Sequence, residues 1–261
     1  MPVALESYCS IGYDPAGSHP TKEQPLGVPF PGSPIDWVNL TGLWTEHNIN
    51  APNWVGWLVT EFSGGQDRLV YDYAVGGHGV DQFADVVKYV FFPTAGQNPK
   101  WAQWFADDTL FVIWIGLNDL ASRPRRRDND AEFVCWKLNP LFEQVEAMYA
   151  TGARNFLFIH VPPMELTPDG QLKHADGEAH KSWNTLLAEY VVTLTTERKD
   201  VKAMVFSYRT FFDIITNPVE YGFEKVDVKQ YGGPMWADHI HPTSNMHRFI
   251  ARDITNFLRH Q

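Results

Sequence analysis

The sequence has few of the features that mark disulfide-stabilised, membrane-spanning or metal-binding proteins. Only two of its 261 residues are cysteines, Cys9 and Cys135, which excludes a disulfide framework and gives no metal-ligand spacing. The longest apolar run, residues 110–117, is far too short to span a bilayer. Residues 1–20 have no basic start followed by an apolar core, so no secretory signal is expected in this chain.

Positive charge is also scarce. The chain has 21 basic against 31 acidic residues and a formal net charge of −10. Because an acidic chain repels phosphate backbones and anionic lipids, we expect neither a nucleic acid nor a membrane as partner. The sequence does not determine the cellular compartment. We expect a cytoplasmic protein if the N-terminus is native, and a secreted one if the chain is a truncated or mature form. The oligomeric state cannot be predicted.

Apolar and aromatic residues, in contrast, are abundant. Hydrophobic residues make up 44% of the chain, with 10 Trp, 10 Tyr and 17 Phe, which is enough to form a sizeable core. We therefore expect one domain over residues 1–261. Residues 12–34 carry six prolines and predict a long ordered loop, of a kind that is often functional.

From residue 53 onward, helical and strand patterns alternate. Helices are predicted over residues 54–59, 99–106, 131–150 with a bend at Pro140, about 183–194, and from Ser244 onward. Strands are predicted over residues 69–74, 110–115, 156–159 and 201–206, with a brief apolar opening at residues 3–5. This alternation predicts an α/β fold, a single three-layer αβα domain around a mostly parallel central sheet. In such sheets, ligands bind and active sites form at the carboxyl ends of the strands.

Four short features lie at or near those strand ends. They are Ser7, the pair Gly76–Gly77, Asn118 in the block 116–119, and Asp238 with His241 in the block 238–242. Each alone has an ordinary explanation as a cap, turn or helix-entry loop. Together they supply a nucleophile, a base, an orienter for the base and oxyanion donors, which are the groups that acyl transfer needs.

The chain resembles the SGNH (GDSL-type) hydrolases, most closely the fungal acetylesterase-like branch. The resemblance lies in these blocks and in Pro25–Leu26–Gly27, residues 50–55 and Val161–Pro162–Pro163. The similarity covers nearly the whole chain. The glycine–x–asparagine–aspartate and aspartate–x–x–histidine–proline blocks are its most specific parts. The flavodoxin-like SGNH fold is what this resemblance implies.

The resemblance also implies a role for each site residue. Ser7 is expected to be the nucleophile and an oxyanion donor, with Gly77 and Asn118 as further donors and Gly76 as the fallback for Gly77. His241 is expected to be the general base, oriented by Asp238. The expected reaction is hydrolysis of a small O-acyl ester, acetyl first, of a carbohydrate or similar polyol, with no metal and no cofactor. Trp236 is expected to line the substrate pocket.

The chain also departs from the family pattern. Leu5 and Glu6 precede Ser7 where the family has glycine and aspartate, and residues 36–47 resemble an insertion. Three other interpretations stay open: acyl transfer or a cyclisation or elimination on the same scaffold, a catalytically weakened binding protein, and a metal site. The metal site would use Asp238, His239, His241 and His247. It is less favoured than the hydrolase, because His247, one turn into the final helix, is expected to face solvent and the chain has no His-Glu-x-x-His motif.

Overall fold

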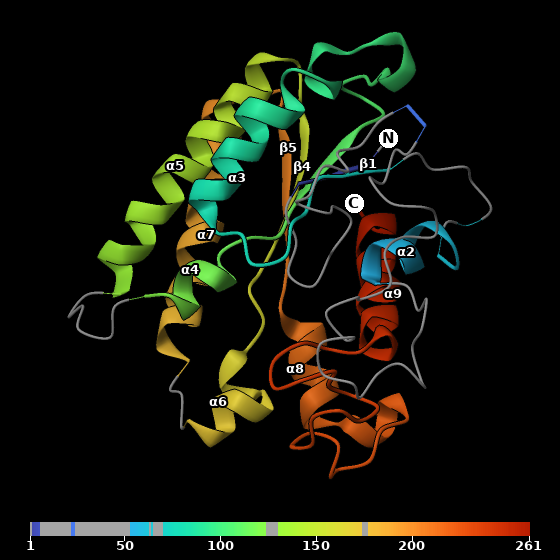
Figure 1. The fold of residues 1–261 in the computed structure, drawn as a ribbon. Coiled ribbons are helices and arrows are strands. Elements are labelled where there is room, and N and C mark those ends of the chain that lie inside the picture. Colours follow the sequence, from blue (N-terminus) through green and yellow to red (C-terminus); the bar gives the residue numbers. More distant parts are fainter. Residues whose placement is uncertain are drawn as a thin grey trace.

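A computed structural model describes residues 2–5, 22–23, 53–62, 64, 70–123, 130–173 and 177–261 (Figure 1). Ser7, the proline-rich loop at 12–34 and the insertion at 36–47 lie outside these residues. For residues 2–5 only the course of the backbone is described.

A parallel sheet of five strands forms the centre of the described structure. The order is β2-β1-β3-β4-β5, and every neighbouring pair is parallel. The strands are β1 (Pro2–Leu5), β2 (Tyr71–Asp72), β3 (Leu110–Ile113), β4 (Asn155–Ile159) and β5 (Lys202–Phe206). β2 is shorter than predicted, and the Asp72 carboxylate accepts a hydrogen bond from the Ala74 N–H at 3.0 Å where the ladder ends.

Helices cover both faces of this sheet (Figure 1). On one side lie α3 (Val80–Val86), α5 (Asp130–Ala150) and α7 (Glu178–Glu197), and on the other lie α2 (Trp54–Val59) and α9 (Ser244–Arg259). α5 packs on both α3 and α7, and α2 packs on α9. The predicted three-layer αβα fold is confirmed, while the extent of a single domain over residues 1–261 stays a prediction.

The core is built from aromatic side chains on the central strands. Phe111 on β3 and Phe156 on β4 are fully buried, with ring centroids 5.6 Å apart. Just beyond β3, the Trp114 indole meets the Trp54 indole of α2 edge-on at 5.9 Å. Burying a side chain of this size contributes about 2–3 kcal/mol, so these contacts fix the helices to the sheet.

The predicted helix over residues 99–106 is wrong, because only a short 3₁₀ turn, Lys100–Ala102, forms there. The Asn98 side chain explains the difference. Its Oδ1 accepts the Trp104 N–H and its Nδ2 donates to the Trp104 carbonyl, both at 2.9 Å. These bonds occupy the backbone groups that a longer helix would use.

The structure also contains helical segments that the sequence analysis did not predict. They are α3 with its π-helical continuation Val87–Phe91, α4 (Leu117–Ala121), α6 (Pro168–Leu172), α8 (Arg209–Thr216), and the 3₁₀ turns Ala95–Gln97, Met164–Leu166 and Pro218–Tyr221. α5 continues through Pro140 and ends before Gly152, which has a positive φ of 112°, a conformation that favours glycine after a helix. No helix among the described residues has the length and apolarity needed to cross a bilayer.

Candidate active site

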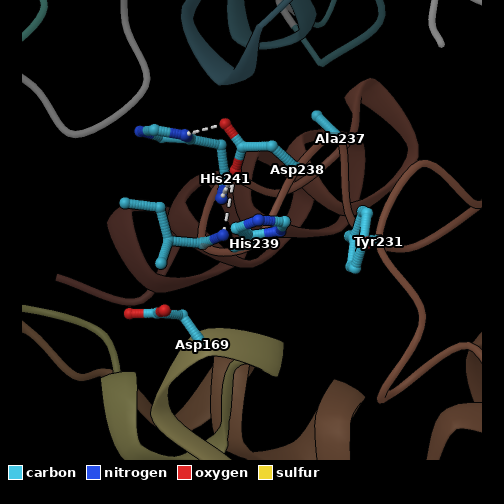
Figure 2. Close-up of a pocket in the computed structure, with 7 residues that line it drawn as sticks. Asp169, Tyr231, Ala237, Asp238, His239 and His241 are labelled. Atoms are coloured by element: carbon cyan, nitrogen blue, oxygen red, sulfur yellow. Dashed lines mark hydrogen bonds and ion pairs between the residues drawn. The ribbon is translucent and has the colours of Figure 1, made fainter. Parts of the chain in front are cut away.

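The Asp238–His241 turn lies between a bridge at Trp236 and the start of α9. The Ala237 N–H donates to the His241 carbonyl at 2.8 Å, which closes the turn. Asp238 Oδ1 accepts the backbone N–H groups of Ile240 at 2.9 Å and His241 at 2.8 Å. Asp238 Oδ2 lies 2.7 Å from His241 Nδ1 (Figure 2). One carboxylate therefore holds both the turn and the imidazole.

The contacts of Asp238 keep it ionised. Burial acts to raise the pKa of this carboxyl, but the bond to the His241 ring and the two backbone N–H donors outweigh burial, so its pKa lies below the ordinary value. An ionised Asp238 accepts from Nδ1–H, which makes Nε2 the basic nitrogen of the neutral His241 ring. The pair can therefore act as a general base.

The helix that follows this turn is firmly anchored. Thr243 caps α9, since its Oγ1 accepts the Met246 N–H at 3.3 Å and donates to the Pro234 carbonyl at 2.7 Å. His247, one turn into α9, is fully buried, and its Nδ1 accepts the Trp54 N–H at 3.2 Å. The prediction that His247 faces solvent is wrong, because the helix turns this residue toward α2.

Gly76 and Gly77 form an exposed turn shortly after β2. Gly77 has a φ of +87°, and a Cβ built on it would meet nothing within 4 Å. Its backbone conformation favours glycine, and the space around it stays open.

The block 116–119 packs against that turn. Gly116 has a φ of +117°, and a Cβ there would lie 2.2 Å from the Trp183 ring, so only glycine fits. Two residues later, Asn118 Nδ2 donates to the His78 carbonyl at 2.8 Å. Gly77 and Asn118 also line the same pocket, of about 480 Å³. The structure thus brings together two of the predicted oxyanion donors.

The carboxyl end of β1 lies between the strands that lead to these two segments. Ser7 itself lies outside the described residues, but β1 ends at Leu5. β1 is paired with β2, which leads to Gly77, on one side and with β3, which leads to Asn118, on the other. β1 is the second of the five strands, and Ser7 follows its last residue by two positions in the sequence.

A second pocket, of about 420 Å³, adjoins the Asp238–His241 turn (Figure 2). Its lining includes Tyr231, His239 and Asp169. Of these, Asp169 lies across the pocket from the turn. The rings of Tyr231 and His239 meet edge-on with centroids 4.3 Å apart, and the Asp169 N–H donates to the His239 carbonyl at 3.0 Å. Sequence reasoning missed Tyr231 and Asp169 as pocket residues, since neither belongs to a motif and only the tertiary fold brings them to the turn.

The structure corrects the prediction for Trp236. Its side chain is completely buried rather than lining a pocket, and its indole N–H donates to the Val228 carbonyl at 3.2 Å. The backbone bridges from Trp236 to Tyr231 and Pro242 hold this residue at the base of the turn. Tyr231 lines the pocket, and Trp236 does not.

Comparisons with known proteins agree with this architecture. A model of the GDSL-like lipase/acylhydrolase family matches residues 37–254. An acetylesterase of Thermothelomyces thermophilus is 28% identical over 96% of this chain and 85% of its own length.

In the described part of the chain, no group of three or more His, Cys, Asp or Glu side chains could hold a metal ion.

Solved structures share the fold at low sequence identity. A lipolytic G-D-S-L family protein of Veillonella parvula superposes with a TM-score of 0.55 at 14% identity, covering 100% of this chain and 98% of that one. A catalytic mutant of an acetylxylan esterase from Geobacillus stearothermophilus also gives 0.55, at 13% identity, covering 99% and 92%. The match of the family model over most of the sequence confirms the resemblance seen in the motifs. The chain belongs to the GDSL-like lipase/acylhydrolase family and is a carboxylic ester hydrolase.

Proposed function

We propose that this protein is a serine esterase that removes small O-acyl groups, acetyl in the first place, from a carbohydrate or similar polyol. The observation that carries the proposal is the Asp238–His241 pair, joined at 2.7 Å within a turn whose backbone N–H groups also donate to the Asp238 carboxylate. A carboxylate bound to Nδ1 is the arrangement that prepares an imidazole to take a proton from a hydroxyl.

The proposed reaction follows from these groups. His241 Nε2 accepts the proton of Ser7 as the Ser7 oxygen attacks the ester carbonyl. The oxyanion is bound by the backbone N–H groups of Ser7 and Gly77 and by the Asn118 side chain. The Asn118 amide carries two hydrogens, so one can bond to His78 while the other binds the oxyanion. The protonated His241 donates its proton to the leaving alcohol oxygen as the ester C–O bond breaks, which leaves the acyl group on Ser7. His241 then takes a proton from water, whose oxygen attacks the acyl carbonyl, and returns it to the Ser7 oxygen as the acid is released.

Two observations support an acetylated polyol as substrate. The relative that matches 96% of this chain is an acetylesterase. The pocket beside His241 offers the ring of Tyr231 as an apolar face and the carboxylate of Asp169 as a hydroxyl acceptor. An apolar wall with few polar groups is typical of sites for small molecules. The chemistry requires no metal and no cofactor.

The test compares turnover of an aryl acetate and of an acetylated oligosaccharide by the wild-type protein, Ser7→Ala and the control Ser10→Ala. We expect Ser7→Ala to lower kcat by at least about 1,000-fold, with Ser10→Ala close to wild type. Full activity in Ser7→Ala would contradict the mechanism. Formation of a new ester when an alcohol is added, without release of acetate, would show acyl transfer instead of hydrolysis.

A further inference from the structure

Asp119, the residue after Asn118, is a buried carboxylate that holds the start of α3. Its side chain is 2% exposed, and its two oxygens accept the Val80 N–H at 3.2 and 3.0 Å. A Cβ on Gly79 would lie 2.8 Å from Asp119 Oδ1, so the close approach requires glycine there. Because Asn118 bonds to the His78 carbonyl, two consecutive residues of α4 hold the segment 78–80.

Lys137, on α5, supplies the counter-charge for this buried carboxylate. Its ammonium lies 3.2 Å from Asp119 Oδ1 and 2.8 Å from Asp81 Oδ2. The Lys137 side chain is 10% exposed, whereas that of Asp81 is 65% exposed. The ammonium also lies 4.6 Å from the centroid of the Trp136 ring. Lys137 is thus fixed between one buried and one exposed carboxylate.

The electrostatics show why the buried pair is sensitive to loss of one partner. Burial raises the pKa of Asp119, and the Lys137 charge and the Val80 N–H counteract that rise only in part. Burial acts to lower the pKa of Lys137, but Asp81 and Asp119 outweigh it, so its pKa is raised. An Asp119 deprived of Lys137 would be an uncompensated buried charge, which favours protonation or displacement of the side chain.

We propose that Lys137 and Asp119 are positioning residues that hold Gly77 and Asn118, two of the three proposed oxyanion donors, in one fixed arrangement. This inference rests on the proposed function. The pair connects three elements, since Asp119 belongs to α4, Lys137 to α5 and Val80 to α3. A shift of the Asn118 side chain or the 76–80 turn would misplace donors that act only when the oxyanion forms. The loss should therefore be seen in kcat.

The experiment compares Lys137→Met, Asp119→Asn, their double variant, Asp81→Asn and the control Lys181→Met in turnover of an aryl acetate. Lys181 forms a comparable lysine–carboxylate pair, with Glu178, on the exposed surface of α7. We expect Lys137→Met to lower kcat about 10- to 100-fold with KM changed by less than about twofold. Lys181→Met should stay within about twofold of wild type. Asp81→Asn leaves the pairing of Lys137 with the buried Asp119 in place, so it should lower kcat less than Lys137→Met does.

The double variant tests charge compensation directly. Asparagine at position 119 keeps an acceptor for the Val80 N–H but carries no buried charge, so the double variant should regain most of the kcat lost in Lys137→Met. A double variant no better than Lys137→Met would overturn the proposal. So would a raised KM with unchanged kcat in Lys137→Met, because Lys137 would then bind substrate directly.

Amide hydrogen exchange gives a readout that does not depend on turnover. In Lys137→Met we expect faster exchange in residues 76–80 and 116–120, and unchanged exchange in the strands. Unchanged exchange in the 76–80 turn would refute the positioning role even if the wild-type protein hydrolysed no ester. Absence of wild-type turnover together with the local change in exchange would instead reject the proposed function and retain the structural coupling.

Discussion

At the scale of single residues, Asp238 has the most connections in the candidate site. Its Oδ1 accepts two backbone N–H groups, and its Oδ2 is bonded to the His241 ring. Any substitution of Asp238 therefore affects both the shape of the turn and the tautomer of the imidazole. An amide has the same shape as the carboxylate but different hydrogen-bonding groups, because its nitrogen donates and only its oxygen accepts.

Asp238→Asn should consequently lower kcat by about 1,000- to 10,000-fold, because the amide N–H₂ facing Nδ1 favours the wrong tautomer of His241. The control is Asp213→Asn, which removes a partly buried carboxylate of α8 that is paired with the exposed Arg209 and should leave kcat within about twofold. Steady-state kinetics with an aryl acetate measure both. A loss below about tenfold in Asp238→Asn would show that Asp238 does not orient the base.

At the scale of elements, two glycines shape the turns that follow β2 and β3, and they do so for different reasons. Gly77 and Gly116 both have positive φ angles, of 87° and 117°. The space around Gly77 is open, while the buried Trp183 ring of α7 occupies the position of a Cβ on Gly116. The first glycine thus serves backbone conformation alone, and the second also allows α7 to pack against the β3 turn.

Gly116→Ala should therefore destabilise the protein more than Gly77→Ala. Backbone strain alone costs about 1–2 kcal/mol at either position, and the clash with Trp183 should add about 1–3 kcal/mol at Gly116. Urea unfolding of both variants measures the difference in the free energy of unfolding. Equal losses would mean that Trp183 moves aside without cost. Gly77→Ala should nonetheless lose activity, because the proposed N–H donor sits in that turn.

At the scale of the whole molecule, the layer formed by α2 and α9 contains a buried histidine. His247 is completely buried and bonded to the Trp54 backbone, and burial, assisted by the charge of His241, lowers the pKa of His247 to about 3. His160, after β4, behaves similarly, since burial lowers its pKa to about 4. Both are held neutral in the folded protein and become charged on unfolding in acid.

Stability should therefore fall on acidification. Below the ordinary histidine pKa of 6.5 the unfolded chain binds a proton on His247 that the folded chain does not, so stability declines as pH falls. The slope is about 1.4 kcal/mol per pH unit for His247 alone, or about 2 kcal/mol between pH 7 and pH 5. Urea unfolding at several pH values measures it.

His247→Asn keeps an acceptor for the Trp54 N–H and removes the titrating ring, so its acid slope should be shallower than that of the wild type by this amount. His260→Asn, at an exposed histidine near the end of the chain, serves as the control and should keep the wild-type slope. An unchanged slope in His247→Asn would show that His247 does not contribute to acid sensitivity.

The parts of this structure that could be predicted are those fixed by local pattern. β3, β4, α7 and α9 show clear apolar periodicity or continuous apolar runs, and the structure confirms them. The sequence of α3 and its continuation also shows helical periodicity, because the buried residues Val80, Phe83 and Val87 are at helical spacing. The failed helix at 99–106 could not be recognised, because it depends on the Asn98 side chain binding a backbone six residues away.

Some residues of the candidate site could likewise be predicted from local motifs, and others could not. Asp238 with His241 and Gly77 with Asn118 could be predicted because short motifs place each pair near the carboxyl end of the sheet. Trp236 was misplaced because closeness in sequence to a motif does not determine which way a side chain points. Tyr231 and Asp169 could not be found, since the pocket they share exists only where α6 meets the 238–241 turn.

The proposed chemistry depends on His241, oriented by Asp238, activating Ser7 as a nucleophile. The most direct measurement is mass spectrometry of the protein after reaction with an aryl phosphonate that labels activated serines, for the wild type and for His241→Ala. We expect one adduct, on Ser7, that forms at least about 100-fold more slowly in His241→Ala. An adduct on another residue, or labelling of Ser7 at the wild-type rate in His241→Ala, would contradict it.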